Sequence, residues 1–284
     1  MRDGAQAPTG LARRGRRLTD RETEQRMLRA AVAMVHRTGL TVSLDHISFE
    51  DVIRDADVSR SAVYRRWPYK DLFFSDLVKE LAKDATPDVA YDELALLRQV
   101  VAGHLGRLDT PELRRRLMLE LIRQLALLDF EALYGSPAWR TYIALHATFL
   151  SLADGALRDQ VQAELARSER DRMARVATAW QQLATLFGYR LRPESGVTFG
   201  TLATLLSGAM RGLVVLALSM PEIAAQRVAA SPFGAAGTDE WSLPALGLGS
   251  IAASLLEPDP AVTWDADRIA SVRQALVSLT LPGG

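Results

Sequence analysis

Two short helical segments separated by a tight turn constrain this chain more than any other stretch. Ser48 is a favourable helix N-cap, and Asp51, three residues later, can reach back to it as in a capping box. Ser59 can cap a second segment, which Pro68 must end because proline cannot continue a helix. Asp57 lies in the turn between them. Two short helices joined in this way predict a helix-turn-helix.

The second helix of such a motif enters the major groove of DNA and leads with its N-terminal residues. In this chain those residues are either short or long and basic, so they can reach base edges and phosphates. We therefore expect DNA contacts from the first N-cap and from the second segment, through Ser48, Ser59, Arg60, Ser61, Ala62, Tyr64, Arg65 and Arg66.

The run from Asp57 to Leu72, DVSRSAVYRRWPYKDL, resembles the signature of TetR-type transcriptional regulators. Its Val-Ser pair, tyrosine, aromatic residue and lysine fall at the spacing of that signature, and the resemblance covers residues 19–83. It implies a DNA-binding homodimer whose remaining helices form a small-molecule pocket and a dimer interface. It also implies that Lys70 contacts a phosphate; the alternative is an ordinary surface lysine at a helix end.

Two features depart from the signature. Asp57 stands where the family usually has glycine, at a turn position that often needs a positive φ. Aspartate is among the few other residues that tolerate this conformation, so we expect the turn to be kept. The connection from Gly39 to Ser48 is also longer than usual, which affects how the first helix meets the DNA backbone.

The charge distribution and the positions of helix-breaking residues predict that the chain has three parts. Residues 1–18 form a basic arm that is expected to be disordered, and a helix-turn-helix domain follows at 19–83. A larger domain for ligand binding and dimerisation is expected at 84–284. The arm can neutralise phosphates or enter a minor groove when DNA is bound, or it is a solvated tail. Its candidate DNA contacts are Arg13, Arg14, Arg16 and Arg17.

Helical periodicity runs almost throughout and no alternating strand pattern appears, so we predict an all-α fold. An N-terminal three-helix unit, closed by a helix from Lys70, precedes the larger helical domain. A loop is expected at 229–243. Helices of the larger domain are expected at 91–108, 111–134, 137–153, 156–187, 193–220, 244–256 and 265–279.

The segment 194–220 is apolar nearly all round and must be covered on most sides. Small residues recur in it every four positions, at Gly200, Thr204, Gly208 and Gly212, and such a ridge lets another helix approach closely. The ridge is interpreted as the dimer interface, to which the resemblance also points; the alternative is a helix buried within one subunit. A membrane span is disfavoured because Arg211 lies inside the segment.

Candidate pocket residues are large amphipathic side chains of the middle helices, namely His104, Trp139, Tyr142, His146, Trp180 and Arg211. Aromatic residues with a few polar groups are typical of small-molecule sites, but they also describe an ordinary core whose polar tips are satisfied. Arg211 is singled out because a cation in an apolar helix needs an anionic ligand, a carboxylate partner or water.

Enzyme and metal signals are weak. The four histidines show no metal-ligand spacing, no phosphate-binding glycine loop follows a strand, and there is no cysteine. Zero net charge gives no bulk attraction to a polyanion, so DNA binding must be local. No metal, cofactor or membrane is expected. The first twenty residues lack an apolar core, which excludes a secretory signal and favours the cytoplasm.

These observations predict a repressor that binds double-stranded DNA at a palindromic operator as a homodimer and is released by a small molecule. Two alternatives stay open. One is an α-helical enzyme with an accessory DNA-binding module, which turnover of a bound metabolite would reveal. The other is a DNA-binding protein that needs no ligand, which a larger domain without a cavity would favour.

Overall fold

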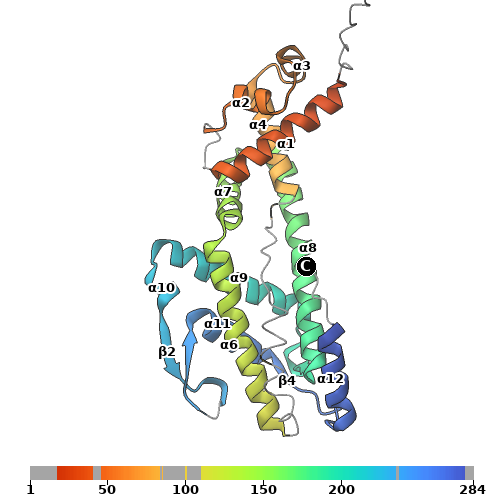
Figure 1. The fold of residues 1–284 in the computed structure, drawn as a ribbon, viewed down its shortest axis with the longest axis vertical. Coiled ribbons are helices and arrows are strands. Elements are labelled where there is room, and N and C mark those ends of the chain that lie inside the picture. The colour runs from red at the N-terminus through yellow and green to blue at the C-terminus, as the bar shows by residue number, and fades with distance from the viewer. Residues whose placement is uncertain are drawn as a thin grey trace, which may run out of the picture.

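The computed structural model describes residues 18–40, 46–83, 85, 100, 110–234 and 237–278. Within them the chain is predominantly helical, as predicted, and forms an elongated molecule with a small helical head at one end (Figure 1). Residues 1–17 of the predicted arm lie outside the described residues. So do His104 and, apart from Val100, the helix predicted at 91–108.

The head consists of α1 (Asp20–Thr38), α2 (Phe49–Asp55), α3 (Arg60–Arg66) and α4 (Lys70–Lys83). Helices α2 and α3 begin where their caps were predicted. The hydroxyl of Ser48 accepts a hydrogen bond from the backbone N–H of Asp51, and Ser59 does the same for Ala62. At the start of α1, Thr19 and its partner three residues on make the full capping box.

The turn between α2 and α3 keeps the predicted conformation. Asp57 has a φ of 51°, in the left-handed region that glycine would adopt most easily. Beneath the turn, Val63 and Trp67 are fully buried, and the Trp67 ring meets Phe73 of α4 edge-on at 5.1 Å between ring centroids. This aromatic packing holds α3 on the surface of the head in one orientation.

The larger part is built on long helices. It contains α6 (Pro111–Gly135), α7 (Pro137–Ser151), α8 (Ala156–Leu186), α9 (Phe199–Ser219), α10 (Glu222–Ala225), α11 (Leu243–Leu255) and α12 (Ala266–Ser278). Helix α8 runs from the head to the opposite end of the molecule, packing against α4 at one point and α9 at another (Figure 1). Helix α9 also packs on α6 and α11. The head is therefore joined to the rest mainly by α4 packing on α8, with further contacts of α1 and α4 with α7.

Two short antiparallel strand pairs accompany the helices of this all-α fold. Strand β1 (Tyr189–Leu191) pairs with β4 (Leu256–Pro258). Strand β2 (Arg227–Ala230) pairs with β3 (Asp239–Ser242), so the expected loop at 229–243 is wrong over much of its length. These strands span only three or four residues, too short for an alternating pattern to be visible in the sequence.

The start of α9 also differs from the prediction. A single 3-10 turn, η3 (Pro193–Ser195), is followed by Gly196 in the left-handed conformation, which ends the turn. The continuous helix then begins at Phe199, with Thr198 as its N-cap. Proline at 193 therefore starts a turn and not the long helix, because the glycine three residues later interrupts it.

Candidate nucleic-acid interface

Helix α3 presents its polar residues on the surface of the head. Ser59, Arg60, Ser61 and Tyr64 are exposed, whereas Val63 on the opposite face is fully buried. The seven-residue helix is thus anchored by its inner face and leaves its N-terminal side chains free to meet a partner. This is the arrangement that reading base edges in a major groove requires.

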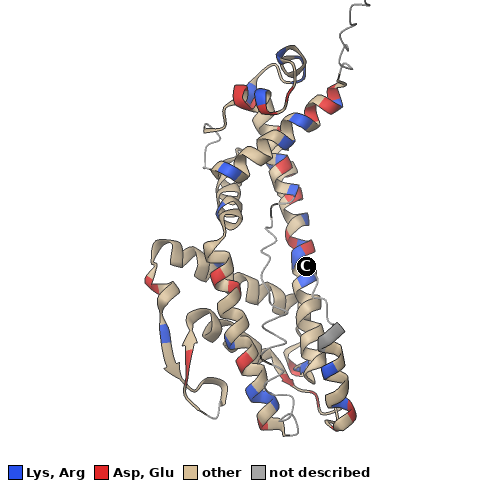
Figure 2. Cartoon of the chain, viewed as in Figure 1, with Lys and Arg blue, Asp and Glu red and all other residues tan. Residues whose placement is uncertain are grey.

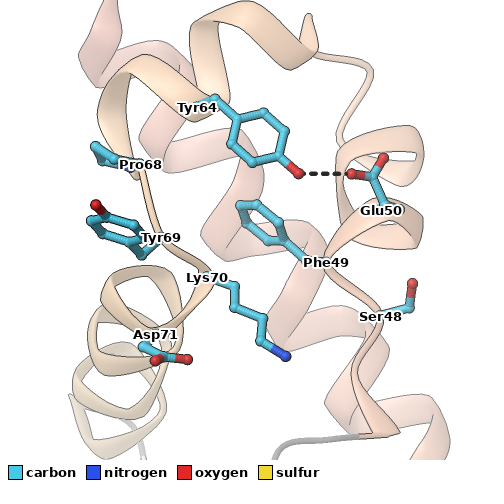
Figure 3. A pocket seen from close by; sticks show the side chains of 8 residues that line it. All are labelled: Ser48, Phe49, Glu50, Tyr64, Pro68, Tyr69, Lys70 and Asp71. Atoms are coloured by element: carbon cyan, nitrogen blue, oxygen red, sulfur yellow. Dashed lines mark hydrogen bonds between the residues drawn. The ribbon is translucent and has the colours of Figure 1, made fainter.

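A hollow of about 490 Å³ lies beside α3, between the start of α2 and the start of α4 (Figure 3). Its lining includes Ser48, Glu50, Tyr64 and Lys70. The Lys70 side chain extends from the first residue of α4 towards the segment that carries Ser48 (Figure 3). A hydroxyl, a phenol and an ammonium group around one hollow suit a phosphate.

One carboxylate already pairs with two of the side chains that are candidates for DNA contact. Glu50 accepts a hydrogen bond from the Tyr64 hydroxyl at 3.0 Å (Figure 3). It also pairs with the Arg60 guanidinium at 2.8 Å. The hydrogen bond to Glu50 raises the pKa of Tyr64, so the phenol stays protonated and able to donate. Both members of the Arg60–Glu50 pair are exposed, and such pairs are weak, so a phosphate can replace the carboxylate at little cost.

Two further predicted DNA contacts are engaged inside the head. Arg65 pairs with Asp20 of α1. Arg66 donates to Glu24 at 3.0 Å and to Asp76 of α4 at 3.3 Å, which ties α3 to both neighbouring helices. Arg66 is therefore positioned first of all to hold the head together. Acidic and basic residues accordingly lie close to one another throughout the head (Figure 2).

Asp76 is the internal counter-ion of this arrangement. Its carboxylate accepts a hydrogen bond from the Trp67 indole at 2.9 Å and pairs with Lys79 at 2.5 Å. Burial by itself would raise the pKa of Asp76, but the hydrogen bonds from Lys79 and Trp67 outweigh burial and lower it. Nothing in the sequence singles out Asp76 or Glu50, because the partners that each has on α3 are far from it along the chain.

A second polar cluster lies where α7, α8 and α9 meet. Arg211 of α9 donates through Nη1 to the Tyr142 hydroxyl of α7 at 2.7 Å and to the carboxylate of Glu169 of α8 at 2.9 Å. The Tyr142 hydroxyl donates to the same carboxylate at 2.5 Å. Arg211 therefore has the acidic partner that its sequence context demands, and this partner, Glu169, was not predicted.

Aromatic rings complete this cluster. Trp139 stacks on Tyr142 with 4.5 Å between centroids, and the His146 ring lies 4.2 Å from Tyr142 on its other side along α7. Four of the predicted pocket residues thus come together. Trp180, also predicted, lies half-buried on α8 and packs against the core.

The small-residue ridge of α9 faces outwards. Gly200, Thr204, Gly208 and Gly212 are all exposed, and a Cβ atom at Gly208 or Gly212 would meet no heavy atom within 4 Å. Large apolar side chains flank the ridge, with Leu205, Val215 and Leu216 at 47%, 47% and 51% exposure. The interpretation that this ridge packs inside one subunit is therefore wrong for the four small residues.

By length and composition α9 also passes as a membrane span, and it does so alone among the helices of the described residues. Its other face is nevertheless covered by protein, since Leu202, Leu206, Met210 and Val214 are almost fully buried. A core helix of a globular protein passes the same test.

Comparison with known proteins gives a limited result. No family model matches the chain, and no curated protein matches it significantly. Among solved structures, a TetR-family transcriptional regulator from Agrobacterium tumefaciens is 15% identical with a TM-score of 0.37, the match covering 82% of this chain and 95% of that one. Full-length TylP, a TetR regulator from Streptomyces fradiae, is 16% identical with a TM-score of 0.37, covering 93% and 94%.

Proposed function

We propose that this protein is a ligand-responsive transcriptional regulator of the TetR type that binds double-stranded DNA through α3 and the start of α4. The observation that carries the proposal is the joint placement of Arg60, Tyr64 and Lys70. The first leads an exposed helix whose inner face is locked by packing, and the other two line the adjacent hollow. Base contacts and phosphate contacts are thus supplied side by side.

In this proposal α3 enters the major groove while Tyr64, Lys70 and Ser48 hold the flanking phosphates. The arm of residues 1–17, with its five arginines, adds contacts to phosphates or to the minor groove. Residues 19–83 act as the DNA-binding domain, and residues 84–284 bind the ligand and form the dimer.

The dimer forms through the exposed ridge of α9. Two copies of α9 can approach closely at Gly208 and Gly212, and the apolar side chains beside the ridge are covered in the process. A symmetric dimer of this kind places two copies of α3 on the two halves of a palindrome. We assign α9 to this interface and not to a membrane, so that the protein acts in the cytoplasm.

Repression is relieved when a small molecule binds the larger domain and favours a dimer geometry that no longer fits the operator. The ligand must bind the two geometries with different affinities. Contacts of α4 with α8 and α7, and of α1 with α7, supply the mechanical link between the two parts.

Selection of duplexes from a random library with the full-length protein tests this function. We expect an inverted repeat whose half-site centres lie one helical turn, about 34–36 Å, or a multiple of it apart. Affinity for the selected duplex is expected to exceed that for random duplex by about 10³-fold or more. Failure to enrich any sequence, with equal affinity for all duplexes, would exclude an operator-specific regulator.

A further inference from the structure

The junction of α7, α8 and α9 contains hydrogen-bond donors that the protein itself does not use. Arg211 uses only its Nη1 atom for the hydrogen bond to Tyr142 and the ion pair with Glu169. Its Nε and Nη2 atoms are buried and have no hydrogen-bond acceptor among the described residues, and the same holds for the indole nitrogen of Trp139. Buried donors of this kind nearly always have a partner in a functional molecule.

These donors belong to one place. The guanidinium carbon of Arg211 lies 5.5 Å from the Trp139 ring centre and 5.1 Å from the Tyr142 ring centre. The unused edge of Arg211, formed by Nε and Nη2, is a planar fork of two N–H donors. A fork of this shape matches the two oxygens of a carboxylate, and the match is bidentate and charge-assisted.

Arg211 is the cation that an anionic ligand would meet at this junction, and the neighbouring Tyr142 carries no charge. Burial and the hydrogen bond to Glu169 raise the pKa of Tyr142, so its phenol is neutral. Arg172 of α8 lies near enough to oppose that rise electrostatically.

The cluster lies at the margin of the core and has a flat apolar wall. The side chains of Arg211 and Glu169 are 19% and 26% exposed, whereas Trp139 is 1% exposed and forms the base of the stack with Tyr142. We propose that this junction is a binding subsite for the carboxylate of a small organic acid, held by the free edge of Arg211 and the indole N–H of Trp139. The inference rests on the proposed function and names the chemical class of its effector.

Such a ligand would act on the link to the head. The three helices of the subsite include α7 and α8, which also contact α4 and α1. A carboxylate on Arg211 competes with Glu169, which at present joins α8 to α9 through that same guanidinium. Loosening this ion pair lets α8 shift relative to α9, and the shift reaches α4.

The experiment titrates the full-length protein, without DNA, with acetate, benzoate and octanoate, each compared with its neutral amide. The probe is the indole N–H resonance of Trp139 in ¹⁵N spectra, assigned with Trp139→Phe. We expect at least one acid to shift this resonance saturably while its amide does not. Glu169→Gln removes the competing charge and is expected to bind that acid about tenfold more tightly, whereas Glu164→Gln, on the same helix, should leave affinity unchanged.

Arg211→Gln is expected to abolish the shift, and circular dichroism reports whether this variant remains folded. If no acid moves the Trp139 resonance more than its amide, in either the wild type or Glu169→Gln, the subsite is excluded. An equal response in Glu169→Gln and Glu164→Gln would also exclude it. Because DNA is absent, such a failure leaves operator binding untouched, and loss of operator specificity would leave acid binding untouched.

Discussion

The carboxylate of Glu50 and the hydroxyl of Tyr64 are joined by a hydrogen bond of 3.0 Å across the hollow between α2 and α3. The same carboxylate pairs with Arg60. In the absence of DNA, Glu50 therefore holds two side chains that we assign to DNA, and it places a negative charge where a phosphate would lie. We therefore expect Glu50 to weaken binding to DNA of any sequence.

Replacing Glu50 with glutamine removes that charge and keeps the size of the side chain. We expect Glu50→Gln to raise affinity for random duplex about threefold to tenfold, in keeping with the modest strength of exposed ion pairs. Fluorescence anisotropy on a labelled random duplex measures the change. Glu80→Gln is the matched control, because Glu80 pairs with Lys83 at the far end of α4. Equal affinities for the two variants would contradict a role for Glu50 at the interface.

Asp76 makes the head sensitive to acid. Its pKa in the folded protein is lowered below the ordinary value of 3.8, so its stabilisation is fully present above about pH 4 and is lost as pH falls through the folded value. Asp76→Asn is expected to lower the free energy of unfolding by about 1–3 kcal/mol at neutral pH. It should also flatten the acid limb of a stability–pH curve from urea denaturation, whereas the exposed Asp171→Asn should do neither.

The ridge on α9 predicts how dimerisation can be broken without unfolding the chain. A Cβ atom at Gly208 would meet no heavy atom of its own subunit within 4 Å, so we expect Gly208→Leu to fold. Overpacking at a helix contact costs about 1–3 kcal/mol, and two-fold symmetry counts the change twice. Sedimentation should show folded monomers at micromolar concentration. Gly135→Leu, at an open position ending α6, should remain dimeric, and a dimeric Gly208→Leu would move the interface elsewhere.

The basic arm predicts an effect of salt. Deleting residues 1–17 removes five arginines, so the slope of log affinity against log salt should fall by up to about four units if each arginine replaces a counterion. Anisotropy titrations at several salt concentrations give this slope. An unchanged slope would mean that the arm stays off the DNA.

Local signals in the sequence were enough to place much of this fold. The caps at Ser48 and Ser59 and the stop at Pro68 located α2 and α3, since these signals act within one turn of a helix. Four of the six pocket candidates lie together in one cluster, and they could be picked out because aromatic and cationic residues in apolar helices are conspicuous. The outward orientation of Gly208 could not be known until the partners of α9 were placed.

What the sequence did not reveal depends on distant pairings. Glu50 and Glu169 look like ordinary surface carboxylates, and only the packing of α2 on α3 and of α8 on α9 gives them their partners. The short strands also depend on pairing between segments that are far apart in the sequence. Residues 189–191 form a strand only because 256–258 lie beside them, and no periodic pattern fits into three residues.

The central claim is that α3 reads bases while the start of α4 holds the backbone. Its most direct test is the affinity of Arg60→Ala and Lys70→Ala for a selected operator, for operators altered one base pair at a time, and for random duplex. We predict that Arg60→Ala loses about 1–3 kcal/mol of discrimination at one base pair, whereas Lys70→Ala weakens binding to all duplexes alike. Lys83→Ala serves as the control on α4. If Arg60→Ala and Lys70→Ala both bound every duplex as the wild type does, the proposed interface would be wrong.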